Sequence, residues 1–350
     1  MAEGEDRTAP SARRLAASAE TGGLGVAHLK RLWSRAARPG EHASWAAADE
    51  FTLDKIVLYG LGVGLREAMA MLARDVSLAE FEGWILEVNG GALDPAGVRR
   101  INDAVARLTG GAADPGLVLP DPAPVLSAEE LAHWQREGYV VLRDAVDTAA
   151  RGAAEQAIWQ SLDADPGDSE NWYGGPQGHS IWLPLIHHPA LQAIRRAQRI
   201  HGAFAQLWGT GDLWATIDRA GFNPPERERW RFPGPHLHWD ASLAPPMPLG
   251  IQGILYLTDT EAEQGAFTCV PGFHHRLAQW LEQLPPGADP RAPERMASLG
   301  AVPIAGRAGD LILWHHALPH GSRPNRARRP RLVQYISMFP TAFRDDRPWV

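Results

Sequence analysis

A proline-rich stretch at residues 111–126 divides the sequence and limits what the chain can fold into. Its prolines stand among small residues: Pro115, Pro120, Pro122 and Pro124. Proline has no backbone N–H and fixes φ, so such a run forms neither a helix interior nor a central strand. We interpret residues 111–126 as a semi-rigid linker and expect a domain boundary there.

The region before the linker, residues 26–110, has the pattern of a helical accessory region. Ser77 and Glu80 have the spacing of a capping box, and Asp94-Pro95 is a typical helix start. Apolar residues recur at helical spacing after both starts. Two hypotheses for this region are homo-oligomer formation and docking of a carrier or other partner. Residues 1–25 are rich in alanine, glycine, serine and charge without periodicity, which predicts a disordered tail.

The region after the linker, residues 127–350, changes from helical to strand-like character. A capping box at Ser127 and Glu130 predicts a helix that Gly138 ends, followed by a strand over 139–142. Further helices are expected over 148–162 and 190–207. Short strands are then expected at 213–220, 236–240, 250–258, 266–270, 301–304, 311–315 and 331–338. Many short strands after a helical preface indicate an α+β fold with an antiparallel sandwich or jelly roll and helices packed outside.

Composition excludes several classes of protein. The formal net charge of −7 argues against binding to nucleic acid or to an anionic membrane. Cys269 is the single cysteine, so an intramolecular disulfide and a thiolate-rich metal site are excluded. The longest apolar stretch, residues 56–65, is far shorter than the roughly 20 residues of a membrane span. The first residues lack the apolar core of a signal peptide, and we therefore expect a cytoplasmic protein.

Residues 236–240 carry side chains that bind metals. In a strand, His238 and Asp240 would point the same way and could hold one ion. Imidazole with carboxylate suits Fe(II), and a triad of two histidines and one carboxylate leaves three positions open for a chelating cosubstrate and O₂. The candidates for the second histidine are His315, His316 and His320. His236 shares the face of His238, so a cupin-like site built on that pair is an alternative.

Arg331 follows His320 on the next predicted strand. An arginine there can form a two-pronged salt bridge with a carboxylate, which is how a dicarboxylate cosubstrate would be held. The neighbouring arginines are expected to lie in a solvated loop: Arg323, Arg326, Arg328 and Arg329. Residues 222–233 before the metal motif are interpreted as a lid or pocket loop.

Over residues 127–340 the chain resembles the phytanoyl-CoA dioxygenase-like family of Fe(II)/2-oxoglutarate-dependent oxygenases. The motifs that carry the resemblance follow in order: residues 126–130 through 138–142, His238-Trp239-Asp240, residues 257–259 with Gly265, residues 270–274, and Gly309-Asp310 before His320. The family usually shows Pro-Gly-Ser-His where Phe273 stands here, which affects only local loop contacts. The resemblance implies a double-stranded β-helix (jelly-roll, cupin-like) core with packed helices, preceded by the α-helical N-terminal region.

Site residues follow from the same resemblance. The metal ligands fall on His238, Asp240 and His320, the arginine for the far carboxylate of 2-oxoglutarate on Arg331, and a hydroxyl beside it on Ser322. Gln252 and Tyr256 alternate on one strand face that the family topology turns inward, where they are expected to line the cosubstrate pocket or to pack in the core. The remaining histidines, His274, His275, His315 and His316, are interpreted as turn, strand and pocket-rim residues.

The implied activity is that of a dioxygenase that uses Fe(II), 2-oxoglutarate and O₂, with ascorbate as the reductant in vitro. It would hydroxylate a small organic substrate of natural-product or lipid type and release succinate and CO₂. Halogenating relatives carry glycine or alanine at the carboxylate ligand, so Asp240 favours hydroxylation over halogenation. Desaturation, ring formation and epoxidation use the same iron site. The alternatives are a non-catalytic cupin-like metal- or ligand-binding protein and a docking or dimerisation protein acting through the N-terminal helices.

Overall fold

The computed structural model describes residues 14–36, 48–117, 119, 122–174 and 180–350. The chain divides into two compact units. We call residues 1–118 with 341–344 the helical unit, and residues 119–340 with 345–350 the sheet unit. This division falls within the stretch interpreted as a linker, of which residues 118, 120 and 121 lie outside the described residues.

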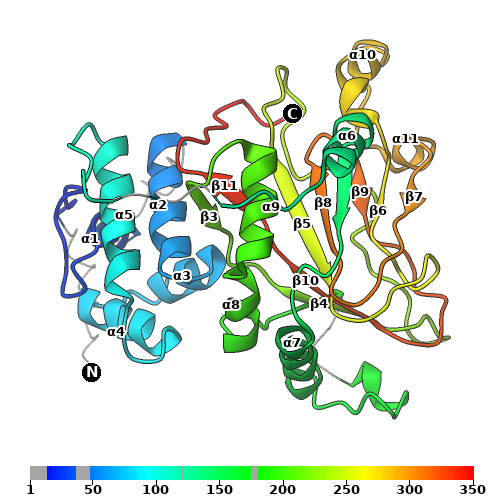
Figure 1. Ribbon diagram of the computed structural model, residues 1–350, viewed down its shortest axis with the longest axis horizontal. Coiled ribbons are helices and arrows are strands. Elements are labelled where there is room, and N and C mark those ends of the chain that lie inside the picture. Colours follow the sequence, from blue (N-terminus) through cyan, green and yellow to red (C-terminus); the bar gives the residue numbers. More distant parts are fainter. Residues whose placement is uncertain (1–13, 37–47, 118, 120–121, 175–179) are drawn as a thin grey trace, which may run out of the picture. The chain divides into compact units, whose positions relative to one another are not determined.

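The helical unit contains five helices over its described residues (Figure 1): α1 (Leu29–Ala36), α2 (Ala48–Gly60), α3 (Leu65–Leu72), α4 (Leu78–Val88) and α5 (Pro95–Leu108). The predicted capping box is present at Ser77, and Asp94 caps α5 just before Pro95. Helix α2 packs against α1, α3 and α5, and Ile56 is fully buried in it. Five helices thus lie within the described part of the region for which helices were expected.

Residues 14–25 differ from the expected disordered tail. The carboxylate of Glu82 accepts hydrogen bonds from the N–H groups of Gly23 and Leu24, both at 3.1 Å. Ala16 is buried, and its N–H donates to Ser34 Oγ at 3.0 Å. The expectation is wrong for these residues because side chains of two helices capture their backbone amides. Residues 1–13 of the expected tail lie outside the described residues.

A buried ionic network joins α2 to the segment that leads into α1 and to α1 itself. The Asp54 side chain is fully buried; it lies 3.1 Å from His28 Nε2 and accepts a hydrogen bond from Arg35. The other ring nitrogen of His28 lies 3.0 Å from Ser18 Oγ. Arg35 also pairs with Glu50. Asp54 is thus the carboxylate that satisfies both a buried imidazole and a largely buried guanidinium.

We expect Asp54→Ala to lower the free energy of unfolding of the helical unit by about 3–5 kcal/mol, because removing one partner leaves buried cationic or polar groups uncompensated. Urea unfolding followed by circular dichroism measures this change. Glu87→Ala, an exposed carboxylate on α4, is the control and should change little. Equal unfolding midpoints for the two variants would show that the network does not stabilise the unit.

The sheet unit contains six α-helices over its described residues: α6 (Ala128–Glu137), α7 (Thr148–Ser161), α8 (Pro189–Arg195), α9 (Gln198–Trp208), α10 (Leu277–Glu282) and α11 (Pro293–Ala297). Short 3₁₀ helices, η2 (Asn171–Tyr173) and η3 (Phe273–His275), accompany them. Helix α6 begins at the predicted capping box of Ser127 and ends at Gly138, whose φ of 76° is left-handed. The helix expected over 190–207 is instead two helices, α8 and α9.

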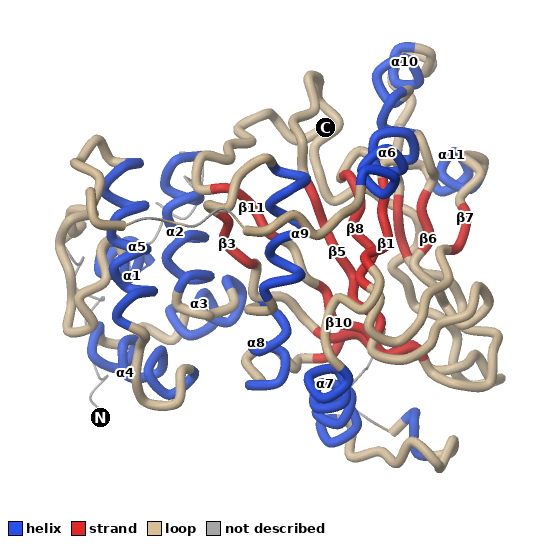
Figure 2. Tube along the Cα trace, viewed as in Figure 1, coloured by secondary structure: helices blue, strands red, loops and turns tan. Residues whose placement is uncertain are grey.

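Over its described residues, the sheet unit also contains three antiparallel sheets (Figure 2). The largest has the strand order β1-β8-β5-β10-β4-β2, and the smaller ones the orders β7-β6-β9 and β11-β3. The bounds are β1 (Tyr139–Leu142), β2 (Trp182–Leu183), β3 (Leu213–Ala215), β4 (Ala220–Asn223), β5 (Ile251–Tyr256), β6 (Thr268–Cys269), β7 (Val302–Pro303), β8 (Leu311–His315), β9 (His320–Gly321), β10 (Arg331–Tyr335) and β11 (Met338–Pro340).

The six-stranded sheet is buried on both faces, since alternate side chains of a strand point to opposite sides. On one face, Leu255, Leu313 and Leu332 belong to the hydrophobic cluster that also contains Ile158 of α7 and Phe204 of α9. On the other face, Tyr256, Trp314 and Val333 belong to the cluster that also contains Phe267 and Cys269 of the β6 region. The fold is therefore α+β with antiparallel sheets. Within the described residues, no helix is long and apolar enough to cross a bilayer.

Candidate active site

The segment that carries the metal motif, residues 236–240, is irregular and not the expected strand. It makes one antiparallel bridge, in which His238 and His320 exchange backbone hydrogen bonds of 2.8 and 2.9 Å. Next to the bridge, the N–H of Ser322 donates to the carbonyl of Pro235 at 2.9 Å rather than to that of His236, so the pairing does not continue in regular register. The bridge nevertheless holds the two histidines opposite each other, so the site is assembled by backbone pairing.

His238, Asp240 and His320 converge, with one potential ligand atom of each within 4.8 Å of the others. His238 Nε2 lies 3.2 Å from Asp240 Oδ1, and His320 Nε2 lies 3.3 Å from Asp240 Oδ2. Among the described residues, no other group brings three or more histidine, cysteine, aspartate or glutamate side chains this close together. The arrangement matches a facial triad of two histidines and one carboxylate.

Both imidazoles are oriented to present Nε2 to an ion. His238 Nδ1 lies 2.7 Å from the carbonyl of His236, and His320 Nδ1 lies 3.1 Å from that of Leu318. A carbonyl only accepts, so each Nδ1 donates its proton there, and Nε2 is the ring nitrogen that can bind an ion once it carries no proton. Backbone partners of this kind fix tautomer and ring orientation at metal sites. The donor set therefore fits a divalent metal.

Electrostatics favour an ionised carboxylate between the two rings. Burial would raise the pKa of Asp240, but hydrogen bonds from His238 and His320 hold it well below its usual range. Burial lowers the pKa of His238, and the hydrogen bond and charge of Asp240 outweigh this effect and raise it. Asp240 therefore stays ionised between the two rings, and a proton would compete with a bound ion for the imidazole of His238.

A cavity of about 300 Å³ opens at the triad. Its lining includes all three ligand residues together with Trp182, Asp218, Arg219, Gln252, Phe267, Trp314, Ser322 and Tyr335. Rings of Phe267 and Trp314 lie 6.2 and 5.0 Å from that of His320, measured between centroids. One wall beside the metal ligands is thus aromatic, while other parts of the lining are polar.

Arg331 is fully buried on β10 and meets the site through Ser322. Its Nη1 donates to the carbonyl of Gly265 at 2.7 Å and to Ser322 Oγ at 3.0 Å. Within the described part of the chain, its Nε and Nη2 have no hydrogen-bond partner. Buried cationic donors left unpaired are costly, so these two nitrogens fit a ligand that brings a carboxylate.

Gln252 and Tyr256 separate in the structure. Gln252 lines the cavity, and its Nε2 donates to Asp240 Oδ2 at 2.8 Å. Tyr256 is fully buried and is not part of the lining; its hydroxyl donates to Ile304 at 2.7 Å and accepts from the N–H of Phe267. Of the two outcomes that its strand face allowed, the structure has Tyr256 packed in the core.

The pair His236 and His238 of the cupin-like alternative is not brought together as a metal site. The His236 ring packs edge-on against Phe232, with centroids 5.3 Å apart, and His236 is not a member of the converging group. His236 takes part through its backbone carbonyl, which orients His238. The geometry supports the triad over this alternative.

The remaining histidines lie outside the triad. His274 and His275 sit in η3, where both Nε2 atoms approach the carbonyl of Gln135. His315 Nδ1 accepts from the N–H of Ala317, and His316 Nε2 lies 2.5 Å from the carbonyl of Pro248. Burial, together with neighbouring imidazoles, lowers the pKa of His315 to about 3. Its ring is therefore neutral.

The charged lining residues Asp218 and Arg219 were missed by sequence reasoning. Burial raises the pKa of Asp218, and the Arg219 guanidinium lies 5.6 Å from the ring centre of Trp182. Their signal in the sequence is an adjacent acid and base between two apolar segments. That signal is weak because exposed turns have the same composition.

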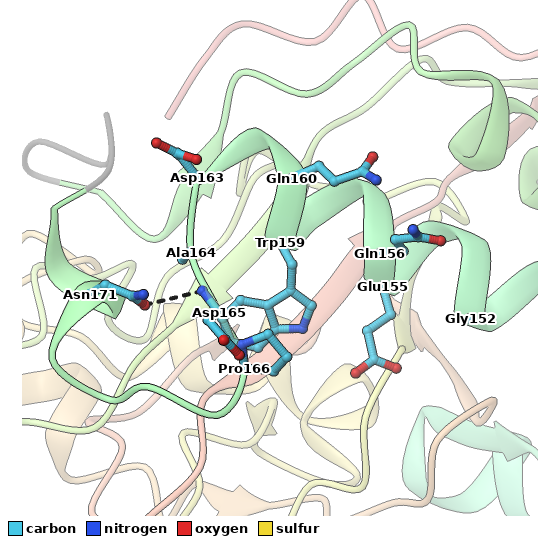
Figure 3. A pocket seen from close by; sticks show the side chains of 10 residues that line it. All are labelled: Gly152, Glu155, Gln156, Trp159, Gln160, Asp163, Ala164, Asp165, Pro166 and Asn171. Atoms are coloured by element: carbon cyan, nitrogen blue, oxygen red, sulfur yellow. Dashed lines mark hydrogen bonds between the residues drawn. The ribbon is translucent and has the colours of Figure 1, made fainter.

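A larger hollow of about 660 Å³ lies beside α7 and is lined by Trp159 and several acidic and amide side chains (Figure 3). Asn171 Oδ1 accepts there from the N–H of Asp165 at 3.2 Å. The predicted metal and cosubstrate residues all lie elsewhere. The triad cavity is therefore the candidate active site.

Comparison with known proteins agrees with this placement. A family model for phytanoyl-CoA dioxygenase (PhyH) matches residues 134–333, more than half of the chain. The chain belongs to the phytanoyl-CoA dioxygenase family. A relative of this family member in Dictyostelium discoideum, named "Putative phytanoyl-CoA dioxygenase", is 23% identical over 256 residues, covering 62% of this chain and 71% of the relative. The predicted family is confirmed.

Three solved structures are also similar to this family member. AviO1 from Streptomyces viridochromogenes Tue57 is 17% identical, with a TM-score of 0.46, over 65% of this chain and 100% of that one. EvdO2 from Micromonospora carbonacea var. aurantiaca, complexed with 2-oxoglutarate, is 16% identical, with a TM-score of 0.44, over 66% and 99%. EctD from S. alaskensis, with bound Fe, is 19% identical, with a TM-score of 0.44, over 62% and 77%.

Proposed function

We propose that this protein is an Fe(II)/2-oxoglutarate-dependent dioxygenase that hydroxylates a small organic substrate with release of succinate and CO₂. The observation that carries the proposal is the triad of His238, Asp240 and His320, in which both Nε2 atoms face the Asp240 carboxylate. Family membership supports the same activity. Asp240 fills the third ligand position, which favours hydroxylation over halogenation.

The residues present fit both cofactors. His238, Asp240 and His320 would hold iron, while Arg331 and Ser322 would hold the far carboxylate of 2-oxoglutarate. When bound, this pair supplies the O₂-dependent oxidation of a C–H bond coupled to decarboxylation of the 2-oxo acid. Gln252 donates to Asp240 Oδ2 and so orients that carboxylate. Phe267 and Trp314 cover His320 and exclude water from one side of the site.

The cavity supports a small and polar substrate group. Its volume of about 300 Å³ must also accommodate the cosubstrate. Asp218 and Arg219 bring opposite charges to the lining, so they do not favour one sign of net charge. The buried hydroxyl of Tyr335 has no partner among the described residues and is free to contact a ligand. We infer that the group reaching the iron carries hydrogen-bonding atoms.

A double-stranded β-helix is the proposed form of the sheet unit. The six-stranded sheet and the β7-β6-β9 sheet contribute side chains to one hydrophobic cluster. The triad lies where β9 meets the segment 236–240. Two antiparallel sheets around a common core support a jelly-roll arrangement.

Succinate release tests the proposed function. Purified protein is incubated with Fe(II), 2-oxoglutarate and ascorbate, with and without each member of a panel of small polar compounds. We expect succinate release to be faster with a compound that is a substrate than without it. Asp240→Ala, which lacks one ligand, is the control and should release none above background. Wild-type release no faster than that of this variant, with and without every compound of the panel, would contradict the proposal.

A further inference from the structure

Arg291 reaches the segment that carries Asp240 from a distant part of the sequence. It lies in the connection between β6 and β7, just before α11. Its Nη1 donates to the carbonyl of Trp239 at 2.9 Å, and its Nη2 donates to that of Ala241 at 2.8 Å. These carbonyls stand directly before and after Asp240. One guanidinium therefore holds the backbone on both sides of the carboxylate ligand.

Residues 345–350 hold the same segment from another side. Arg291 Nη2 also donates to the carbonyl of Val350 at 2.9 Å. Ser242 Oγ donates to the carbonyl of Pro348 at 2.6 Å and accepts from the N–H of Val350 at 3.2 Å. The N–H of Leu243 donates to Val350 as well, at 3.2 Å. Arg291 and residues 345–350 thus form a clamp on residues 239–243.

This clamp matters because residues 239–243 lack regular secondary structure. The side chain of Asp240 is half exposed, with 51% of its area accessible, so packing does not fix it. By contrast, His320 is buried in a strand and His238 is paired with it. Asp240 is therefore the ligand whose position depends most on contacts made by its neighbours along the chain.

We propose that Arg291 is a positioning residue that sets Asp240 for metal binding by holding the Trp239 and Ala241 carbonyls, with residues 345–350 completing the clamp. This inference rests on the proposed function in one respect, namely that the triad binds a divalent metal. A guanidinium suits the task because its planar fork presents several donors in fixed directions. Lysine offers a compact ammonium on a flexible stem, so it would hold the two carbonyls less rigidly than arginine does.

The test measures Co²⁺ affinity and the visible absorption spectrum of the Co²⁺ complex in the full-length protein. Loss of a group that orients a metal ligand typically weakens metal affinity about 10–100-fold, and we expect Arg291→Met to fall in that range. Arg291→Lys should recover part of the affinity. The spectrum should shift in both variants, because a misplaced carboxylate changes the ligand field. Ser242→Ala, which loosens residues 345–350 alone, should show a smaller loss.

Arg295→Gln is the matched control, since Arg295 lies in α11 of the same connection. It should bind Co²⁺ as the wild type does. If His320→Ala binds Co²⁺ as tightly as the wild type does, the proposed function itself is contradicted. Wild-type binding through the triad, with unchanged constant and spectrum in Arg291→Met and Arg291→Lys, would overturn the inference alone. If Arg291→Met does not fold, Arg291→Lys decides: weaker binding with a shifted spectrum supports the inference, and wild-type behaviour overturns it.

Discussion

Replacing His238, Asp240 or His320 by alanine is expected to abolish iron binding and 2-oxoglutarate turnover. Each replacement removes one of three converging ligands, and two remaining side chains no longer form a facial triad. Because groups that hydrogen-bond to metal ligands already change metal affinity by about 10–100-fold, loss of a ligand should weaken it by more than about a hundred-fold. Iron content of each purified, folded variant measures the effect.

His236→Ala, His315→Ala and His316→Ala are the matched controls, because they remove imidazoles close in sequence to the ligands but outside the converging group. They should keep iron. His236→Ala retains the backbone carbonyl that orients His238. His316 is buried, so its variant is assessed only if it folds. Iron lost from His316→Ala and kept in His320→Ala would show that the distal ligand is assigned to the wrong residue.

Local signals in the sequence identified those elements whose determinants lie within a few residues. The capping boxes at Ser77 and Ser127 form as predicted, because each needs only a hydroxyl and a carboxylate three positions apart. The strand expected at 311–315 has those bounds as β8, in a run of buried apolar residues. Gly138 ends its helix because it adopts a left-handed φ.

Elements whose determinants lie far apart in sequence were not predictable in this way. Residues 236–240 read as a strand, yet their one pairing partner, β9, is two residues long. The alternation of Gln252 and Tyr256 allowed either a place in the pocket lining or a place in the core. The structure decides for Tyr256, because its hydroxyl donates to the carbonyl of Ile304, which lies far away in sequence. Arg291 carries no motif at all, because its role depends on the fold bringing it to the carbonyls beside Asp240.

The metal triad could be predicted although it joins residues that are far apart in sequence. His238 and Asp240 are only two residues apart, and the single bridge at His238 suffices to bring both to the site. The choice of His320 over His315 and His316 came from the resemblance to a family. In the structure, backbone pairing between His238 and His320 brings that histidine to the site, whereas His315 and His316 bind backbone groups elsewhere.

Arg331→Ala is expected to weaken 2-oxoglutarate binding by roughly ten-fold to several hundred-fold. A hydrogen bond to a charged group contributes about 1.5–3 kcal/mol, and about 1.4 kcal/mol corresponds to a factor of ten. Arg331 has two nitrogens, Nε and Nη2, that are buried and have no partner among the described residues. A carboxylate would pair with these donors and remove the cost of leaving them unsatisfied. The dissociation constant of 2-oxoglutarate for the anaerobic Fe(II) protein measures the effect.

The variants around Arg331 separate its geometry from its charge. Arg331→Lys should recover only part of the affinity, since an ammonium cannot supply two parallel donors. Arg328→Ala and Arg329→Ala remove nearby exposed guanidinium groups and should change little. Iron affinity should be nearly constant in all four variants, because Arg331 is not a member of the triad. An unchanged 2-oxoglutarate constant in folded Arg331→Ala would remove the cosubstrate assignment, because the carboxylate would then have to be bound by a group other than this guanidinium.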